Sequence, residues 1–209
     1  MYNTFSNGEY CLSVAASSCT VGARIYCHDM SSCSPREYLT LPAGPDNNYS
    51  ETRRNHDDAC TTGLIKFEKL GLNLTTMMIN SWDWTFSIQR DVNTAAVCDS
   101  YPFYGYAYSC TASGTASTAV DLTGTAFYIP DDVTWVTVLY TPYMQNVART
   151  SQVFIATCGG DCGGCAPQYP GQLSVYYDSS VIEDRVMPVA YDAAYDVNTC
   201  TPYPAIVRH

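Results

Sequence analysis

The chain has 209 residues, of which 46% are hydrophobic and only 14% are charged, so it is long enough and apolar enough to bury a core. Its formal net charge of −10 repels phosphate backbones and anionic lipid, and we therefore predict no nucleic-acid partner. The sequence contains no apolar run long enough to cross a bilayer, so we also predict no membrane span.

Hydrophobic alternation with a period of two dominates the chain and predicts strands. In segment 82–89, Trp82, Trp84 and Phe86 alternate with polar residues, as in a strand with one buried face. Helical periodicity is nearly absent, and only 189–197 could form a short helix. The other predicted strands, which are rich in Val, Ile, Thr and Tyr, are 9–15, 21–27, 63–70, 101–110, 125–129, 132–140, 150–158, 172–178 and 181–191.

Two polar stretches interrupt this pattern without dividing the chain. Residues 42–63 are predicted to form a long polar loop, and residues 111–126 a flexible connection or a flat edge strand. We predict one all-β domain over residues 1–209, a disulfide-stapled antiparallel β-sandwich or jelly roll with long polar loops. Residues 1–10 and 200–209 carry aromatic residues and prolines, and are expected to form extended arms that lie against another surface.

Eleven cysteines are spread along the chain, which is typical of proteins from oxidising compartments. We therefore predict a secreted or surface-exposed chain. The N-terminus lacks a signal-peptide pattern, so we expect a mature product numbered from one. Cys98 and Cys110 could close the aromatic segment 101–108 as a hairpin, and the odd count leaves at least one thiol unpaired or bonded to another chain. The disulfide candidates are Cys11, Cys19, Cys27, Cys33, Cys60, Cys98, Cys110, Cys158, Cys162, Cys165 and Cys200.

Two N-x-S/T sequons point to the same compartment. Asn48-Tyr49-Ser50 and Asn73-Leu74-Thr75 predict N-linked glycans on Asn48 and Asn73, and Asn198 begins a weaker N-x-C variant.

The segment 157–167, TCGGDCGGCAP, places Cys158, Cys162 and Cys165 within eight residues. The favoured interpretation is a glycine-rich turn in which Cys158 bonds Cys165 and Cys162 bonds a distant partner such as Cys200. A zinc knuckle with a histidine is an alternative. The spacing also looks like the iron–sulfur site of radical-SAM enzymes, but the helices of their α/β barrel are missing. We predict no metal and no cofactor.

The run 160-GDCGG-164 is similar to the nucleophile loop of chymotrypsin-like proteases, in the cysteine version found in viral enzymes. The resemblance covers five residues. It implies Cys162 as the nucleophile and the amides around Gly160 to Cys162 as the oxyanion hole. The candidates for the other triad members are His28 or His56 and Asp83 or Asp91.

The 18 tyrosines suit interfaces and sugar faces, because each offers a flat ring with a polar tip. The run 101-YPFYGYAY-108 is either a glycan platform or one half-buried face of a sheet. Acidic doublets such as Asp131-Asp132 have calcium-ligand chemistry but no EF-hand spacing, and we interpret them as solvated turns.

We therefore predict a secreted structural or adhesive glycoprotein subunit, not an enzyme. It self-assembles into a homo-oligomer or polymer (filament, coat or layer) through its arms and sheet edges. The alternatives are a chymotrypsin-like cysteine hydrolase using Cys162 and a carbohydrate-binding module.

Overall fold

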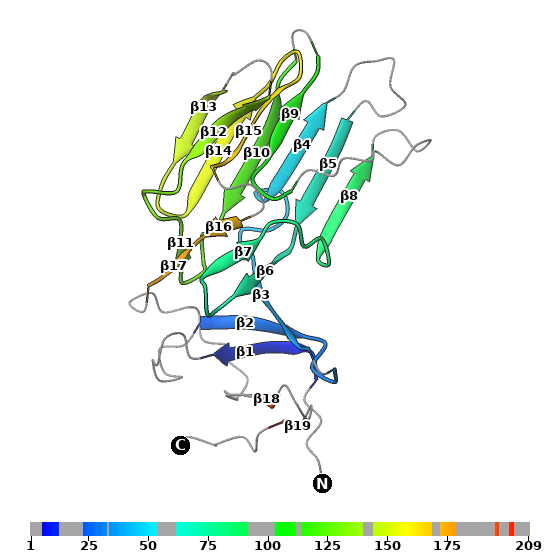
Figure 1. The fold of residues 1–209 in the computed structure, drawn as a ribbon, viewed down its shortest axis with the longest axis vertical. Coiled ribbons are helices and arrows are strands. Elements are labelled where there is room, and N and C mark those ends of the chain that lie inside the picture. The colour runs from blue at the N-terminus through cyan, green and yellow to red at the C-terminus, as the bar shows by residue number, and fades with distance from the viewer. Residues whose placement is uncertain are drawn as a thin grey trace.

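The computed structural model describes residues 6–12, 23–32, 34–53, 62–91, 103–111, 114–139, 144–168, 172–178, 195–196 and 201–202. Within these ranges the chain forms strands, turns and loops and contains no helix (Figure 1), which confirms the all-β prediction. In the same ranges no apolar helix of bilayer-spanning length occurs.

The strands form two main sheets and two small ones (Figure 1). The six-stranded sheet has the order β1 (Gly8–Leu12), β2 (Ala23–His28), β3 (Arg36–Thr40), β6 (Lys69–Asn73), β7 (Met78–Asn80) and β16 (Gln172–Ser174). The nine-stranded sheet has the order β12 (Trp135–Leu139), β15 (Gly163–Pro167), β9 (Ala107–Ser109), β4 (Tyr49–Arg53), β10 (Ala116–Asp121), β14 (Val153–Cys158) and β13 (Met144–Arg149), with β5 (Thr62–Phe67) beside β4 and β8 (Ser87–Asp91) beside β5. The small sheets pair β11 (Phe127–Tyr128) with β17 (Tyr176–Tyr177) and β18 (Tyr195–Asp196) with β19 (Thr201–Pro202).

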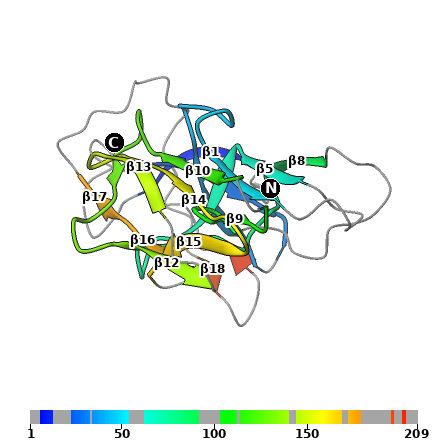
Figure 2. The same cartoon turned by 90° about the horizontal axis from the view of Figure 1, so that it is seen from above.

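The nine-stranded sheet divides into two layers at β4. One edge of β4 pairs antiparallel with β10 through residues 49–50 and parallel with β9 through residues 51–53. The layers β10–β14–β13 and β9–β15–β12 lie one above the other in Figure 2. Between them, the ring of Trp135 stacks on that of Phe154 with centroids 3.7 Å apart. This arrangement agrees with the predicted sandwich, and β4–β9 is the parallel pair among otherwise antiparallel described pairs.

One hydrophobic core connects the sandwich with the six-stranded sheet. In β2, Ala23, Ile25 and Cys27 are buried and alternate with half-buried residues, as a period of two requires. Fully buried side chains from both sheets belong to the same cluster: Ile25, Leu39, Leu70, Ile79 and Leu173 of the six-stranded sheet, and Ile65, Phe67, Val120 and Ala156 of the nine-stranded sheet.

The predicted polar stretches are wrong in one respect, because each contains a central strand. β4 lies in the predicted loop 42–63. β10 lies in 111–126, which was predicted as a flexible connection or an edge strand, and it has neighbours on both sides, β4 and β14. Both strands bury small polar residues whose hydroxyls find backbone partners: Ser50 donates to the carbonyl of Phe103 at 2.9 Å and Thr118 to that of Tyr49 at 3.0 Å. A buried hydroxyl that is hydrogen-bonded costs little, so polarity here did not indicate exposure.

The predicted strand 82–89 is also wrong in its first half. Residues 81–86 form turns, and β8 begins at Ser87. The carboxamide of Asn80 accepts the Trp82 N–H at 3.2 Å, and the carboxylate of Asp83 accepts the Thr85 N–H at 2.9 Å. These side-chain contacts replace the ladder bonds of a strand.

Near the termini the structure changes three predictions. Residues 8–10 of the predicted N-terminal arm belong to β1, at the edge of the six-stranded sheet. In the predicted helix 189–197, residues 195–196 form β18. The predicted strand 181–191 and most of the C-terminal arm lie outside the described residues.

Candidate functional site

The glycine-rich cysteine segment is a turn between β14 and β15, closed by two disulfides. Cys158 bonds Cys165, and Cys162 bonds Cys110. Positive φ angles run through Gly159 (106°), Gly160 (100°), Asp161 (44°) and Cys162 (69°). A Cβ on Gly159 would lie 2.7 Å from the side chain of Ser109, so glycine is required at that position.

The structure contradicts the hydrolase interpretation of this turn. The Cys162 sulfur is in a disulfide and cannot attack a carbonyl. The amides that would form the oxyanion hole are already used, since Cys162 donates to the Ser109 carbonyl at 2.7 Å and Asp161 to the Thr111 carbonyl at 3.2 Å. His28 lies in β2 of the other sheet, and His56 lies outside the described residues.

Of the other cysteines, Cys27 is the one whose side chain the structure describes. The pairing of Cys162 with Cys110 replaces both the suggested Cys98–Cys110 closure and the suggested bond to Cys200. Cys27 is a free thiol rather than a disulfide partner. Its burial, together with the nearby charges of Glu37 and Glu9, raises the pKa of the thiol to about 12, so it is unreactive at neutral pH.

Six cysteines cannot be assigned: the side chain of Cys11 is not described, and Cys19, Cys33, Cys60, Cys98 and Cys200 lie outside the described residues. Among the described residues, no cluster of three or more His, Cys, Asp or Glu could hold a metal ion.

The two sequons have opposite environments. Asn48 is 0% exposed, and its amide donates to the Gly44 carbonyl at 3.0 Å. Its carboxamide oxygen accepts from the Tyr104 hydroxyl and, at 2.8 Å, from the Asp121 N–H. A glycan on Asn48 has no room in this fold, and this burial argues against the predicted site. Asn73 is exposed at the end of β6, and its oxygen accepts the N–H of Thr75 in the following turn at 2.9 Å.

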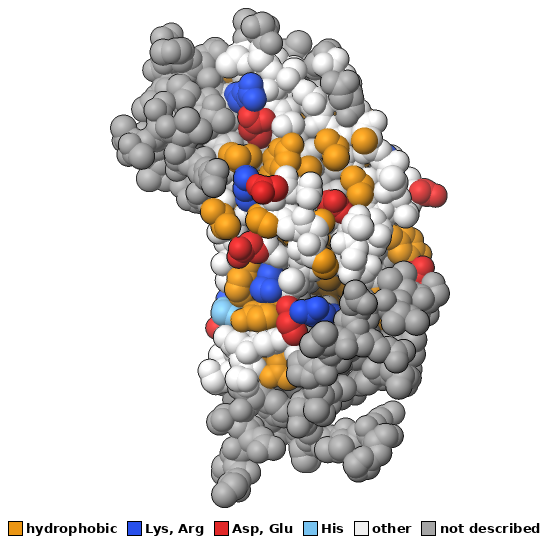
Figure 3. Space-filling model, turned by 180° about the vertical axis from the view of Figure 1, so that it is seen from behind, with side chains coloured by type: hydrophobic (Ala, Val, Ile, Leu, Met, Phe, Trp, Pro, Cys, Tyr) orange, Lys and Arg blue, Asp and Glu red, His pale blue; other side chains and the backbone are white. Residues whose placement is uncertain are grey.

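Charged side chains on the outer face of the six-stranded sheet are paired with one another. Lys69 lies 3.4 Å from a carboxylate oxygen of Glu9, and its ammonium is 4.5 Å from the ring centroid of Tyr26. Arg36 donates to Asp29 at 2.9 Å. Figure 3 shows basic and acidic side chains next to one another along this side of the molecule.

Asp83 lies at the centre of a second group on the same face. It accepts from the Tyr38 hydroxyl at 2.8 Å and lies 3.9 Å from the Arg36 guanidinium. Burial alone would raise the pKa of Asp83, but hydrogen bonds from Thr85 and Tyr38 and the charge of Arg36 outweigh it and hold the pKa below its usual value.

The basic side chains of the larger sheet are held in the same way. Arg53 pairs with Glu51 at 2.8 Å, and Lys66 pairs with Asp46. Arg149 donates to three backbone carbonyls between residues 130 and 133, at 2.7 to 3.3 Å. Together with the six-stranded sheet, every lysine and arginine side chain that the structure describes has a partner; the side chain of Arg90, in β8, is not among those described.

A row of aromatic rings lies at the surface; we call it the aromatic strip and define it as Trp84, Trp82, Phe103, Tyr106 and Tyr108. Successive ring centroids are 6.1, 4.7, 4.8 and 6.3 Å apart. Trp82 is 50% exposed, Phe103 is buried, and the other three are half-buried. The strip joins the turn before β8 to β9, where Ala107 faces the core and its neighbours face outward.

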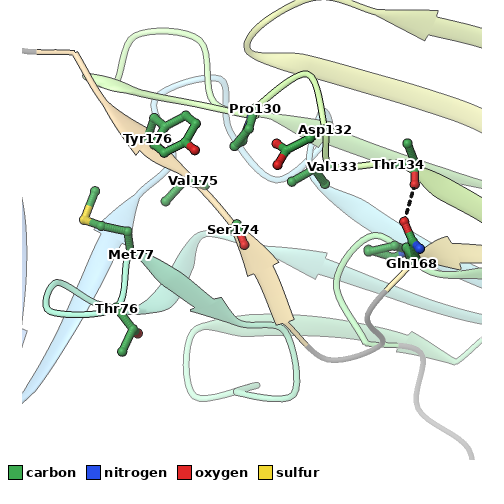
Figure 4. A pocket seen from close by; sticks show the side chains of 11 residues that line it. Thr76, Met77, Pro130, Asp132, Val133, Thr134, Gln168, Ser174, Val175 and Tyr176 are labelled. Atoms are coloured by element: carbon green, nitrogen blue, oxygen red, sulfur yellow. Dashed lines mark hydrogen bonds between the residues drawn. The ribbon is translucent and has the colours of Figure 1, made fainter.

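A cleft of about 300 Å³ lies where the two sheets meet (Figure 4). Four segments far apart in sequence line it: the β6–β7 turn with Met77, the β11–β12 connection with Pro130 and Asp132, the end of β15 with Gln168, and β16–β17 with Ser174 and Tyr176. The Thr134 hydroxyl donates to the Gln168 carboxamide at 2.7 Å and closes one side. Sequence reasoning missed this cleft, and the doublet Asp131-Asp132 was the one signal near it.

Known proteins resemble the chain at the level of sequence. A model of the GON domain family matches residues 1–62 and 52–177. The chain is 28% identical over 173 residues to A disintegrin and metalloproteinase with thrombospondin motifs 20 of Homo sapiens, an alignment that covers 73% of this chain and 9% of the relative. The protein of the same name from Mus musculus is 27% identical over 196 residues, covering 83% and 10%. A disintegrin and metalloproteinase with thrombospondin motifs gon-1 of Caenorhabditis elegans is 25% identical over 173 residues, covering 71% and 8%.

The chain therefore spans about a tenth of the length of these curated relatives. No solved structure matches it. The relatives are secreted extracellular proteins that carry this domain, and the predicted extracellular localisation is confirmed.

Proposed function

The chain belongs to the GON domain family, and we propose that it is an adhesive domain of a secreted protein that binds neutral glycans through the aromatic strip. The GON domain is a non-catalytic domain of the metalloproteinases that carry it. In this chain the one segment that resembled a nucleophile loop is a disulfide-bonded turn.

The observation that carries the proposal is the exposure of Trp82 at a fixed position. The Trp82 N–H donates to the Asn80 side chain, and the Trp82 ring contacts Phe103. The N–H of the next residue, Asp83, donates to the Asn80 carbonyl at 3.1 Å. A ring held in this way loses little conformational entropy on binding, and Trp and Tyr dominate contact energies at interfaces. Tyr106 and Tyr108 extend the strip with rings that end in hydroxyl groups.

The charge distribution favours a neutral ligand. The chain carries a formal net charge of −10, and the basic side chains that the structure describes, such as Arg53, Lys66 and Lys69, are already paired. Sulfated or sialylated glycans would therefore be repelled. Uncharged sugars can stack on the rings without that cost.

Binding to an array of neutral and sulfated glycans, followed by calorimetry, tests the proposal. Trp82→Ala should weaken the binding of a neutral glycan by about tenfold or more, as loss of a central aromatic contact does. Tyr176→Ala is the matched control, because Tyr176 is a similarly exposed ring (52%) outside the strip. Absence of neutral-glycan binding, or equal losses in the two variants, would contradict the proposal.

A second candidate function is self-assembly, supported by the edge strand β13. Val147 on β13 is 46% exposed, and Ile155 on its neighbour β14 is 40% exposed. An edge strand with exposed apolar side chains can pair with another chain. This edge supports the sheet-edge part of the predicted homo-oligomer or polymer, such as a filament, coat or layer.

Sedimentation velocity tests the self-assembly candidate. Val147→Lys should shift an oligomer to monomer, because charge on an edge strand opposes pairing. Thr137→Lys, at an exposed position of the other edge strand β12, should leave the distribution unchanged. A wild-type chain that is monomeric at micromolar concentration would remove this candidate.

We further propose that Asn73 carries an N-linked glycan, so that the domain is a glycoprotein. The Asn73 side chain is exposed, and the bonds that Thr75 and Thr76 make to it use its oxygen and not its amide nitrogen, the atom that carries an N-linked glycan.

A further inference from the structure

The cleft at the junction of the sheets contains an interrupted strand ladder. Tyr128 on β11 pairs with Tyr176 on β17, and the same antiparallel register continued by two residues places Pro130 opposite Ser174. Proline has no N–H to donate, so the ladder ends there. Ile129, between Tyr128 and Pro130, directs its N–H to the opposite side, where it donates to the Ser151 carbonyl at 2.6 Å.

The interruption leaves the outer edge of β16 directed into the cleft. Val175 donates its N–H to the Met77 carbonyl at 3.0 Å, so the backbone groups of Val175 point toward β7. Neighbouring residues of an extended strand direct their backbone groups to opposite sides. The N–H and C=O of Ser174 therefore point away from β7, toward the side on which Pro130 lies (Figure 4).

The walls of the cleft supply an acidic group and an exposed ring. Asp132 lines the cleft and is exposed, and no ion pair with it occurs among the described residues. Arg149 makes no ion pair with it, because that guanidinium donates instead to the carbonyls of Pro130, Asp131 and Val133. Tyr176 stands at the same cleft with 52% of its surface exposed.

We propose that this cleft binds an extended peptide segment of a partner protein that carries an arginine. The peptide backbone pairs with the open edge at Ser174, as in strand addition to a sheet. The arginine side chain lies against Tyr176 and pairs with Asp132, since its planar guanidinium both stacks on rings and matches a carboxylate. The formal charge of −10 also favours a basic segment.

The probe is a phage-displayed library of random linear peptides, selected on the full oxidised chain. An enriched peptide is then synthesised with a fluorophore, and its Kd is measured by anisotropy. We expect enriched peptides to share an arginine flanked by β-branched residues. Replacing that arginine with neutral citrulline should weaken binding by about tenfold, because the carboxylate pair and the cation–ring contact are lost together. Enriched peptides without a basic residue, or binding of glycans but of no peptide, would overturn the proposal.

Two pairs of variants separate the charge contact from the strand edge. Asp132→Asn should weaken binding of the enriched peptide about twofold to fivefold, which is the range for an exposed ion pair. Asp131→Asn makes the same charge change at the exposed neighbour outside the cleft lining and should have no effect. Equal effects of the two variants would refute a role for Asp132.

For the edge, Ser174→Pro should abolish binding, because it removes the outward N–H without removing a bond to β7. Ser174→Ala retains that N–H and should bind as the wild type does. If Ser174→Pro fails to fold, N-methylation of the peptide backbone at alternate residues provides the same test on the ligand. Full binding by every N-methylated peptide would exclude strand addition.

Discussion

Replacing Cys110 and Cys162 together with alanine should destabilise the domain by about 4 kcal/mol. The bridge joins residues 52 apart in sequence. Closing a loop of that length lowers the conformational entropy of the unfolded chain, which raises its free energy by about 4 kcal/mol. The Cys158–Cys165 bridge spans only seven residues, for which the same relation gives about 2.5 kcal/mol. The longer bridge therefore contributes more through the unfolded state.

Urea unfolding followed by tryptophan fluorescence measures this difference. The Cys110→Ala/Cys162→Ala variant should show a lower midpoint and also a higher m-value, because an unfolded chain without that bridge exposes more surface. The Cys158→Ala/Cys165→Ala variant serves as the comparison and additionally loses the packing of two fully buried sulfur atoms.

A loss of less than about 1 kcal/mol in the first variant would refute the reasoning, because the loop-closure term would then be missing. Alkylation of Cys110 or Cys162 in the native chain without reductant would refute it independently.

Three further predictions follow from single side chains. Between about pH 9 and 12 the folded chain keeps the Cys27 proton that the unfolded chain loses, so the unfolding constant should rise by up to tenfold per pH unit in this window. In urea titrations at alkaline pH, Cys27→Val should reduce this dependence of stability on pH, and an unchanged dependence would disprove the prediction. Because the pKa of Asp83 is lowered in the folded chain, its carboxylate stabilises the fold at pH values above its unfolded pKa of about 4, and this stabilisation is lost as pH falls through the folded pKa. Asp83→Asn should therefore make the free energy of unfolding less dependent on pH in acid, and an unchanged dependence would count against the contact with Tyr38. Asn73→Gln should abolish the mass lost on enzymatic deglycosylation of chain secreted from animal cells, whereas Asn48→Gln should leave that loss intact and lower the melting temperature; a glycan on Asn48 would contradict its burial.

Strands with apolar alternation could be predicted from the sequence, and strands with small polar interiors could not. The segment of β2 follows the period of two because Ile25 and Cys27 alternate with outward residues. In β4 and β10 the buried Ser50 and Thr118 make hydrogen bonds whose partners lie elsewhere in the chain, so local polarity predicted loops. Trp82 fitted a strand pattern, but two side-chain contacts with the backbone turned its segment away from the ladder.

The candidate sites show the same division. The tyrosines of 101–108 were predicted as a platform or a sheet face, and the structure places two of them in the aromatic strip. The disulfide between Cys158 and Cys165 lies within one short segment, where proximity in sequence suggests it. The cleft depends on Met77, Pro130 and Ser174 meeting across the fold, and no local pattern encodes that meeting.

The last strand of the six-stranded sheet, β16, comes from the far end of the chain, because Leu173 pairs with Ile79 on β7. During synthesis, β1 to β7 leave the ribosome well before β16, the strand that completes their sheet, has been made. Assembly should therefore wait until most of the chain has emerged, and secretion should depend on chaperones that shield the waiting edge of β7. For the same reason, neither half of the molecule should be obtainable as a stable fragment.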